Sequence, residues 1–278
     1  GLLIGRPADA ADKAFWRALF GEAPRPPRLL PLLPESTVLA LETTAQPDQV
    51  WRIVREAILR FGCQGSEEKL KAELDKAGRE MGVSPEALSA GLGSGLVCSL
   101  QLDPARQETL PLPSGTVTIP AVGFLLIANV NDDAPLRYLL NVFSKKGSPL
   151  APAETDFGTV YQSPGPLPGP LPIQFSLAQH DGRLFLASAP EVIRQSLAGH
   201  AGSAGLSRKA AFIKVFDGLP ANGNAFFYCD ARLRQTIRQT AGQVKGLPAR
   251  GPMAMLSLVS FDALPDVSSG WVLANRPE

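Results

Sequence analysis

Apolar and polar positions follow one pattern four times along this chain. A short apolar run leads into a polar turn, and a stretch with apolar residues at helical spacing follows; the four runs are residues 37–43, 123–130, 182–188 and 224–230. β-branched and aromatic residues in such runs predict strands, and the spacing that follows predicts amphipathic helices. The recurrence predicts a fold built from strand–helix units. An internal duplication is the preferred explanation, and chance recurrence is the alternative.

The rest of the pattern predicts further elements between these units. Helices are expected over residues 8–20, 49–61, 66–82, 84–93, 135–143, 189–199, 207–216 and 231–244. Further strands are expected over residues 96–102, 115–119, 158–162, 173–179, 255–261 and 270–274, while residues 144–157 are expected to be irregular. The pair Asp181-Gly182 predicts a tight hairpin. Proline-rich runs at 23–34 and 163–172 predict extended connectors, because proline blocks helices and central strands.

The order of these elements predicts the fold class. Strands come in adjacent groups between helices, which favours an α+β fold with an antiparallel or mixed sheet and helices mainly on one face. The predicted organisation is an N-terminal helix and connector (1–34), a first α+β unit (35–150) and a second α+β unit (151–278). The two units can also pack as one continuous domain.

Polar residues stand where several helices are expected to begin. Side chains of Ser and Asp at such positions accept hydrogen bonds from free backbone N–H groups. Ser188 with Glu191 also matches a capping box. The residues predicted to cap helices are Asp48, Ser66, Ser84, Asp133, Ser188 and Asp230.

Composition narrows the class of protein. Hydrophobic residues make up 45% of the chain and charged residues 19%, as in globular proteins. The formal net charge is +1, from 27 basic and 26 acidic residues, so nucleic-acid binding is not expected. No apolar run reaches the roughly 18 residues that span a bilayer. Gly1 has no Met before it, so we expect that a leader has been removed.

Candidate chemistry is sparse. The two histidines, His180 and His200, have no metal-ligand spacing around them, and no nucleophile elbow or phosphate-binding loop is present. Asp132 and Asp133 are adjacent carboxylates, but adjacent side chains point in different directions and one is expected to cap a helix. We therefore expect no catalytic, cofactor-binding or metal-binding residue and no cofactor.

The three cysteines are Cys63, Cys98 and Cys229. Their number is odd and their spacing wide, which argues against a disulfide scaffold. We expect three semi-buried small residues. One disulfide with one free thiol is the alternative, and the sequence does not decide which residues would pair.

Short motifs in these units resemble a bacterial family of exported proteins without assigned function. The matching segments are LPEST (residues 33–37), GRLFLASAPE (residues 182–191) and NAFFYCDA (residues 224–231). The resemblance covers most of residues 33–275. It implies a periplasmic or envelope location and an interaction or structural role, and it supplies no catalytic residues. The sequence itself leaves a cytoplasmic location open.

Three functions follow as expectations. The first is a non-enzymatic envelope or periplasmic protein with a binding or structural role, which would act through its surface or an apolar groove. Its partner would be an unknown protein or apolar ligand. The second is binding of a lipid or other apolar ligand, because several strands are apolar on both faces unless helices cover both. The third is a hydrolase whose site is assembled from distant carboxylates, with Asp133 and Asp230 as candidates.

Overall fold

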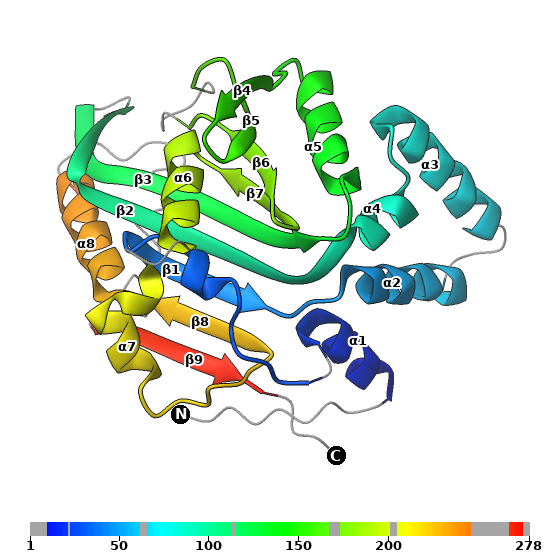
Figure 1. The fold of residues 1–278 in the computed structure, drawn as a ribbon, viewed down its shortest axis with the longest axis horizontal. Helices are drawn as coiled ribbons and strands as arrows, with labels where there is room; N and C mark the ends of the chain where they lie inside the picture. Colours follow the sequence, from blue (N-terminus) through cyan, green and yellow to red (C-terminus); the bar gives the residue numbers. More distant parts are fainter. Residues whose placement is uncertain are drawn as a thin grey trace.

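The computed structural model has an α+β fold, as the pattern predicts (Figure 1). It describes residues 10–21, 23–61, 66–112, 115–166, 173–200, 205–245 and 267–274. Within these ranges it has eight α-helices and a nine-stranded open sheet. Neighbouring strands are antiparallel throughout this sheet. Of the two predicted sheet types, the antiparallel one is therefore observed.

The sheet has the strand order β4-β5-β6-β7-β3-β2-β1-β8-β9. Its strands are β1 (Thr37–Thr43), β2 (Leu92–Leu112), β3 (Gly115–Val130), β4 (Ala151–Thr155), β5 (Gly158–Gln162), β6 (Ser176–His180), β7 (Arg183–Ala187), β8 (Ala225–Cys229) and β9 (Ser269–Leu273). The helices are α1 (Ala10–Phe20), α2 (Pro47–Phe61), α3 (Ser66–Met81), α4 (Pro85–Gly91), α5 (Ala134–Lys145), α6 (Pro190–His200), α7 (Ala210–Phe216) and α8 (Ala231–Lys245), with 3-10 turns η1 (Leu30–Leu32) and η2 (Leu206–Arg208).

Strands of both predicted α+β units belong to this one sheet. β1, β2 and β3 lie in the middle, β4 to β7 continue it on one side, and β8 and β9 on the other. β1 pairs with β2 and with β8, so it joins two parts of the chain that lie far apart in the sequence. An antiparallel sheet allows this because its strands need no crossover helix.

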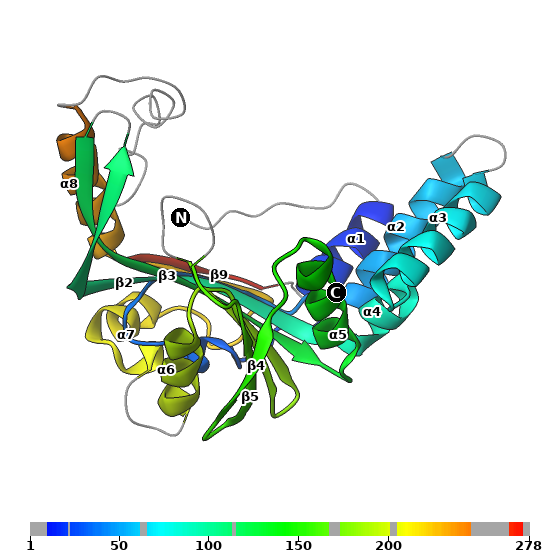
Figure 2. The same ribbon diagram turned by 90° about the horizontal axis from the view of Figure 1, so that it is seen from above.

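β2 and β3 form a long hairpin where shorter strands are predicted. Its register shifts between Asp103 and Gln107, a stretch that contains Pro104. Proline has no N–H to donate, so the ladder is interrupted where proline stands and the strand can bend. The part of the hairpin beyond the shift turns out of the sheet, and α8 lies against it (Figure 2).

The β6–β7 hairpin forms as predicted. Asp181 and Gly182 both have positive φ, 47° and 68°, at its turn. Two positive φ values are typical of the type I′ turn, whose twist matches that of the strands it joins. The Asp-Gly pair is therefore sufficient as a local signal.

Two predictions of local structure are wrong. Residues 144–157 are not all irregular, because they include β4. β4 is an edge strand, where Pro152 is tolerated, and its Ala and Glu residues give little strand signal. Residues 207–216 are not one helix: Lys209 is extended (φ −66°, ψ 124°) and separates η2 from α7. The predicted strand at 255–261 lies outside the described residues.

One face of the sheet, here called the inner face, carries the main hydrophobic core. α6, α7 and η1 cover it, and α8 lies on the opposite side of the sheet (Figure 2). Its largest fully buried side chains include Phe185, Phe226 and Tyr228 from the strands and Ile193 from α6. Interior packing of this kind makes the inner face a filled layer.

The opposite face carries an apolar row that stays partly exposed. Cys98, Leu41, Phe227 and Trp271 lie directly opposite one another on β2, β1, β8 and β9, and we call these four residues the open face. Leu41 is 41% exposed and Trp271 46%. The Phe227 and Trp271 rings stack with centroids 5.4 Å apart. Side chains alternate along a strand, so this row points away from the inner face.

Candidate functional site

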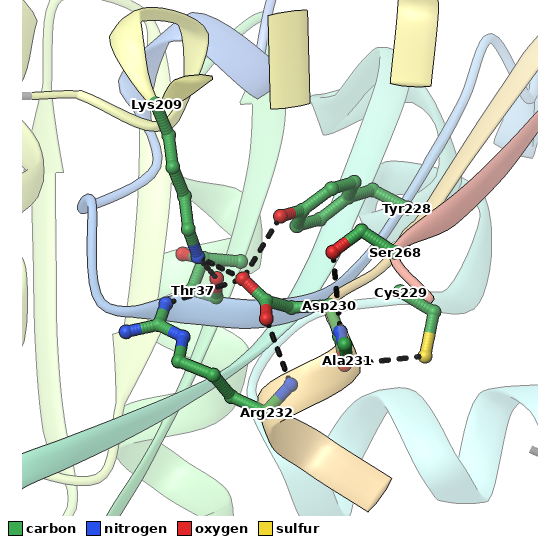
Figure 3. A network of polar contacts seen from close by, with 8 residues as sticks. All are labelled: Thr37, Lys209, Tyr228, Cys229, Asp230, Ala231, Arg232 and Ser268. Carbon is green, nitrogen blue, oxygen red and sulfur yellow. Dashed lines mark hydrogen bonds and ion pairs between the residues drawn. The ribbon is translucent and has the colours of Figure 1, made fainter. Parts of the chain in front are cut away.

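A buried polar network lies where β8 ends and α8 begins (Figure 3). Tyr228 and Asp230 come from the end of β8, and Arg232 from the first turn of α8. Lys209 reaches in from the extended residue between η2 and α7, and the backbone of Thr37 comes from the start of β1. The network thus joins three stretches that are separated in the sequence: residues 228–232, Lys209 and Thr37.

Both carboxylate oxygens of Asp230 are engaged. Oδ1 accepts a hydrogen bond from the backbone N–H of Arg232 at 2.9 Å. Oδ2 forms an ion pair with the Lys209 ammonium and accepts from the Tyr228 hydroxyl at 3.0 Å. The Arg232 guanidinium lies 3.3 Å from the same oxygen. Lys209 also donates to the backbone carbonyl of Thr37 at 3.0 Å.

These contacts set the protonation of the network. Burial by itself would raise the pKa of Asp230, but the Lys209 hydrogen bond, the Arg232 N–H and both cations outweigh it and lower that pKa to about 2. Burial lowers the pKa of Lys209, and the Asp230 carboxylate opposes that shift. Burial and the charge of Asp230 raise the pKa of Tyr228, so its hydroxyl remains a donor.

The arrangement is better suited to holding segments together than to catalysis. A general acid or base needs a free position from which it can reach a substrate. The Asp230 side chain is only 5% exposed, and protein donors occupy both of its oxygens. We therefore interpret the network as a cross-link between α7, α8, β8 and β1.

The pKa of Asp230 predicts acid sensitivity. Its pKa is about 2 in the folded chain, against an ordinary value of 3.8, so the unfolded chain takes up the proton first. The contribution of the ionised Asp230 carboxylate to the stability of the fold is therefore complete above about pH 4. This contribution is lost as the pH falls towards about 2. We expect the free energy of unfolding to fall over this interval, and to fall less steeply in Asp230→Asn, which cannot titrate. Urea unfolding followed by circular dichroism measures both slopes; equal slopes would contradict the assignment.

The two carboxylates considered for a hydrolase do not come together. Asp133 follows β3 and Asp230 follows β8, and these strands run in opposite directions because three antiparallel pairings separate them. Their C-terminal ends therefore lie at opposite ends of the sheet. Asp133 is also largely exposed and pairs with Arg137 of α5 at 3.2 Å. The two residues cannot act on one bond.

The predicted cap at the start of α5 is assigned to the wrong residue. Asp133 stands at the cap position, but its side chain makes no capping hydrogen bond. Asp132 accepts from the backbone N–H of Ala134 at 2.8 Å instead. Either of two adjacent Asp residues can serve such a turn, and the backbone angles of the turn decide which one does.

The predicted capping box at Ser188 and Glu191 is wrong as well. Ser188 lies one residue too early for α6, and its hydroxyl accepts from the backbone N–H of Phe124 at 3.0 Å. Glu191 pairs with Arg194 at 2.7 Å on the helix surface. Because the β3–β7 register brings Ser188 beside Phe124, the neighbouring strand competes with the helix for this hydroxyl.

Other predicted caps have mixed outcomes. Asp230 caps α8 and Ser84 caps α4, whose Ala87 N–H donates to the Ser84 hydroxyl at 3.1 Å. Asp48 is not a cap, because α2 begins one residue earlier, at Pro47, and Asp48 lies in its first turn. Proline suits a first helical position because its missing N–H would have no partner there. The side chain of Ser66 lies outside the described residues.

The histidines and cysteines occupy separate places. His180 ends β6 and lies 3.4 Å from Asp181, and His200 ends α6. Cys98 and Cys229 are free thiols and do not pair with each other. Semi-buried cysteines are predicted, but Cys229 is buried and Cys98 is exposed. Cys63 lies outside the described residues. No metal-binding group of three His, Cys, Asp or Glu occurs within the described ranges.

Glu42 of β1 is a second buried carboxylate. The sequence shows it only as an acid within an apolar strand and does not indicate its partners. It is 3% exposed and alternates with Leu41, so it points to the inner face. It accepts from three consecutive backbone N–H groups, of Arg28 at 2.8 Å, Leu29 at 3.1 Å and Leu30 at 2.6 Å. Burial raises its pKa, and these three hydrogen bonds act against that shift. Glu42 thus attaches the proline-rich connector to the sheet.

Comparisons with known proteins found no match to this chain. No model of a known family matches the chain, and neither a curated protein nor a solved structure matches it. None of the helices in the described ranges is long and apolar enough to cross a bilayer.

Proposed function

We propose that this protein is a non-enzymatic binding protein whose open face contacts an apolar surface of a protein partner. The observation that carries the proposal is the exposure of Leu41 (41%) and Trp271 (46%) within one row of facing residues. Removing apolar surface from water is favourable by about 25 cal/mol per Å², before the costs of association are subtracted. Trp is also among the residues that dominate binding energy at interfaces.

The sheet holds this row in place before any partner binds. β1 is hydrogen-bonded to β2 on one side and to β8 on the other, so the backbone beneath Leu41 is fixed. In Figure 2, α8 and α1 rise at opposite ends of the sheet on the side away from α6 and α7. A rigid surface loses little conformational freedom on binding, which favours affinity.

A protein partner suits this surface better than a small apolar ligand. Ligand pockets are concave and bury most of the ligand. The inner face is filled by Phe185, Phe226 and Tyr228, and the exposed apolar side chains of the sheet lie on the open face instead. The proposal includes an envelope location, which rests on the resemblance to exported proteins.

Cys98 allows a direct test, because it is an exposed thiol at the end of the row. In a Cys63→Ser background, a benzophenone maleimide attached to Cys98 is illuminated in extracts of the native cells. We expect a cross-linked adduct of one discrete protein mass. Leu41→Glu should reduce its yield about tenfold or more, because a buried unpaired charge costs well over the ~1.4 kcal/mol that corresponds to a factor of ten.

The matched control lies on the other side of the sheet. Ile213 of α7 is 54% exposed, so a cross-linker at Ile213→Cys, with Cys98→Ser, samples an exposed apolar site elsewhere. This position should give no adduct of that mass, and Ile213→Glu should leave the Cys98 adduct unchanged. Equal adducts from both positions, or none from Cys98, would contradict the proposal. A low-mass apolar adduct would indicate a lipid ligand instead.

A further inference from the structure

α2 carries an apolar stripe that the rest of the protein covers only in part. Trp51, Val54, Ile58 and Phe61 follow one another at steps of three, four and three, which places them on one face of the helix. None of the fifteen residues of α2 is fully buried. Val54 and Ile58 are each 39% exposed, and Phe61 is 81% exposed. A helix with this pattern normally buries its stripe in the core.

α1, which packs against α2, also carries exposed aromatic side chains. Both helices lie at the end of the sheet remote from α6, α7 and α8 (Figures 1 and 2). Phe15 is 39% exposed and Trp16 is 45% exposed. The Trp16 ring stacks on Phe20 with centroids 5.3 Å apart, which holds it in a fixed orientation. Both helices of this packed pair thus carry partly exposed apolar or aromatic groups.

The charges around these groups are mostly positive. Two carboxylates, Asp48 and Glu56, accompany four exposed arginines on the described faces of α1 and α2: Arg17, Arg52, Arg55 and Arg60. The Arg60 guanidinium lies over the Phe61 ring at 5.6 Å, so a cation adjoins the most exposed apolar residue. An apolar stripe with Trp and Phe, bordered by arginines, is typical of helices that lie in the surface of an anionic bilayer.

We infer that α1 and α2 dock on the surface of an anionic lipid bilayer. α2 is about 22 Å long and would lie in the plane of the headgroups, with its apolar stripe towards the acyl chains. The arginines would pair with lipid phosphates, to which guanidinium groups bind with two parallel hydrogen bonds. This surface is distinct from the open face, so the inference goes beyond the proposed function and does not depend on it.

Vesicle sedimentation tests this inference with the purified full chain. Vesicles of phosphatidylcholine with and without phosphatidylglycerol serve as the probes. We expect binding about tenfold or more tighter to the anionic vesicles, and weaker binding as salt is raised. Trp16, which is 45% exposed, should shift its emission to the blue on binding. The double variant Trp51→Phe with Trp271→Phe makes this shift visible by removing the other two tryptophans.

The decisive variant is Ile58→Glu, which places a charge in the middle of the stripe. It should weaken binding to anionic vesicles about tenfold or more, whereas Ile58→Leu and the distant Ile213→Glu should bind as the wild type does. Binding that is unchanged in Ile58→Glu, equal for both vesicles, or absent from a folded wild-type chain would overturn the inference. So would a wild-type dimer in lipid-free solution that Ile58→Glu dissociates, because a second copy would then cover the stripe. Ile58→Glu should leave the Cys98 adduct intact, which separates this test from that of the open face.

Discussion

Lys209→Ala is expected to lower the free energy of unfolding by about 3 kcal/mol at neutral pH. The side chains of Lys209 and Asp230 are only 11% and 5% exposed, so removing the ammonium leaves a buried carboxylate without its closest cation. Arg232 lies 3.3 Å from the carboxylate and is 41% exposed, which makes it a weaker substitute. Urea denaturation followed by circular dichroism measures the loss.

The control for this prediction is Lys214→Ala. Lys214 is an exposed lysine of α7, and its loss should change the free energy of unfolding by less than about 0.5 kcal/mol. The double variant Lys209→Met with Asp230→Asn should lose less free energy of unfolding than the sum of the losses in Lys209→Met and in Asp230→Asn. In the double variant no buried charge is left unpaired. A loss below about 1 kcal/mol in Lys209→Ala, or full additivity, would show that the network is not a cross-link.

Glu42→Ala is expected to destabilise the protein by about 3 kcal/mol or more, because three backbone N–H groups lose their acceptor at once. The donors belong to Arg28, Leu29 and Leu30, which begin a segment whose leucines are buried in the core. The attachment of the connector should therefore weaken first. Hydrogen exchange at residues 28–33 should rise by more than the global loss of stability explains.

Two further variants test the role of the Glu42 carboxylate. Glu42→Gln keeps one oxygen acceptor, so its loss of stability should lie between those of the wild type and Glu42→Ala. Glu35→Ala removes an exposed carboxylate just before β1 and should have little effect. If exchange at residues 28–33 stays unchanged in Glu42→Ala, Glu42 does not attach the connector.

Parts of the buried network could be predicted from the sequence, and parts could not. Asp230 is predicted as the cap of α8, and it is one, because a cap depends on the next three residues. Its pairing with Lys209 has no such local signal, since twenty-one positions separate the two in the chain and Lys209 falls within a segment that reads as one helix. Only the packing of α7 against the sheet brings the ammonium to the carboxylate.

The α2 stripe and the open face could also be predicted from the sequence only in part. The stripe of α2 can be recognised from spacing, and the strand that carries Phe227 is visibly apolar on both faces. Spacing predicts which side chains share a face, but it does not say whether another element covers that face. Leu41 and Ile58 stay partly exposed because of where α8, α1 and α4 lie.

The sequence by itself determined the α+β class, most strand positions, the Asp181-Gly182 turn and the caps at Ser84 and Asp230, because these depend on neighbours within a few residues. The tertiary structure alone decided the strand order, with β1 between β2 and β8, and hence the open face. It also decided that Glu42 and Lys209 meet partners far along the chain. Such contacts depend on which elements pack together, and that choice rests on the burial of the whole core.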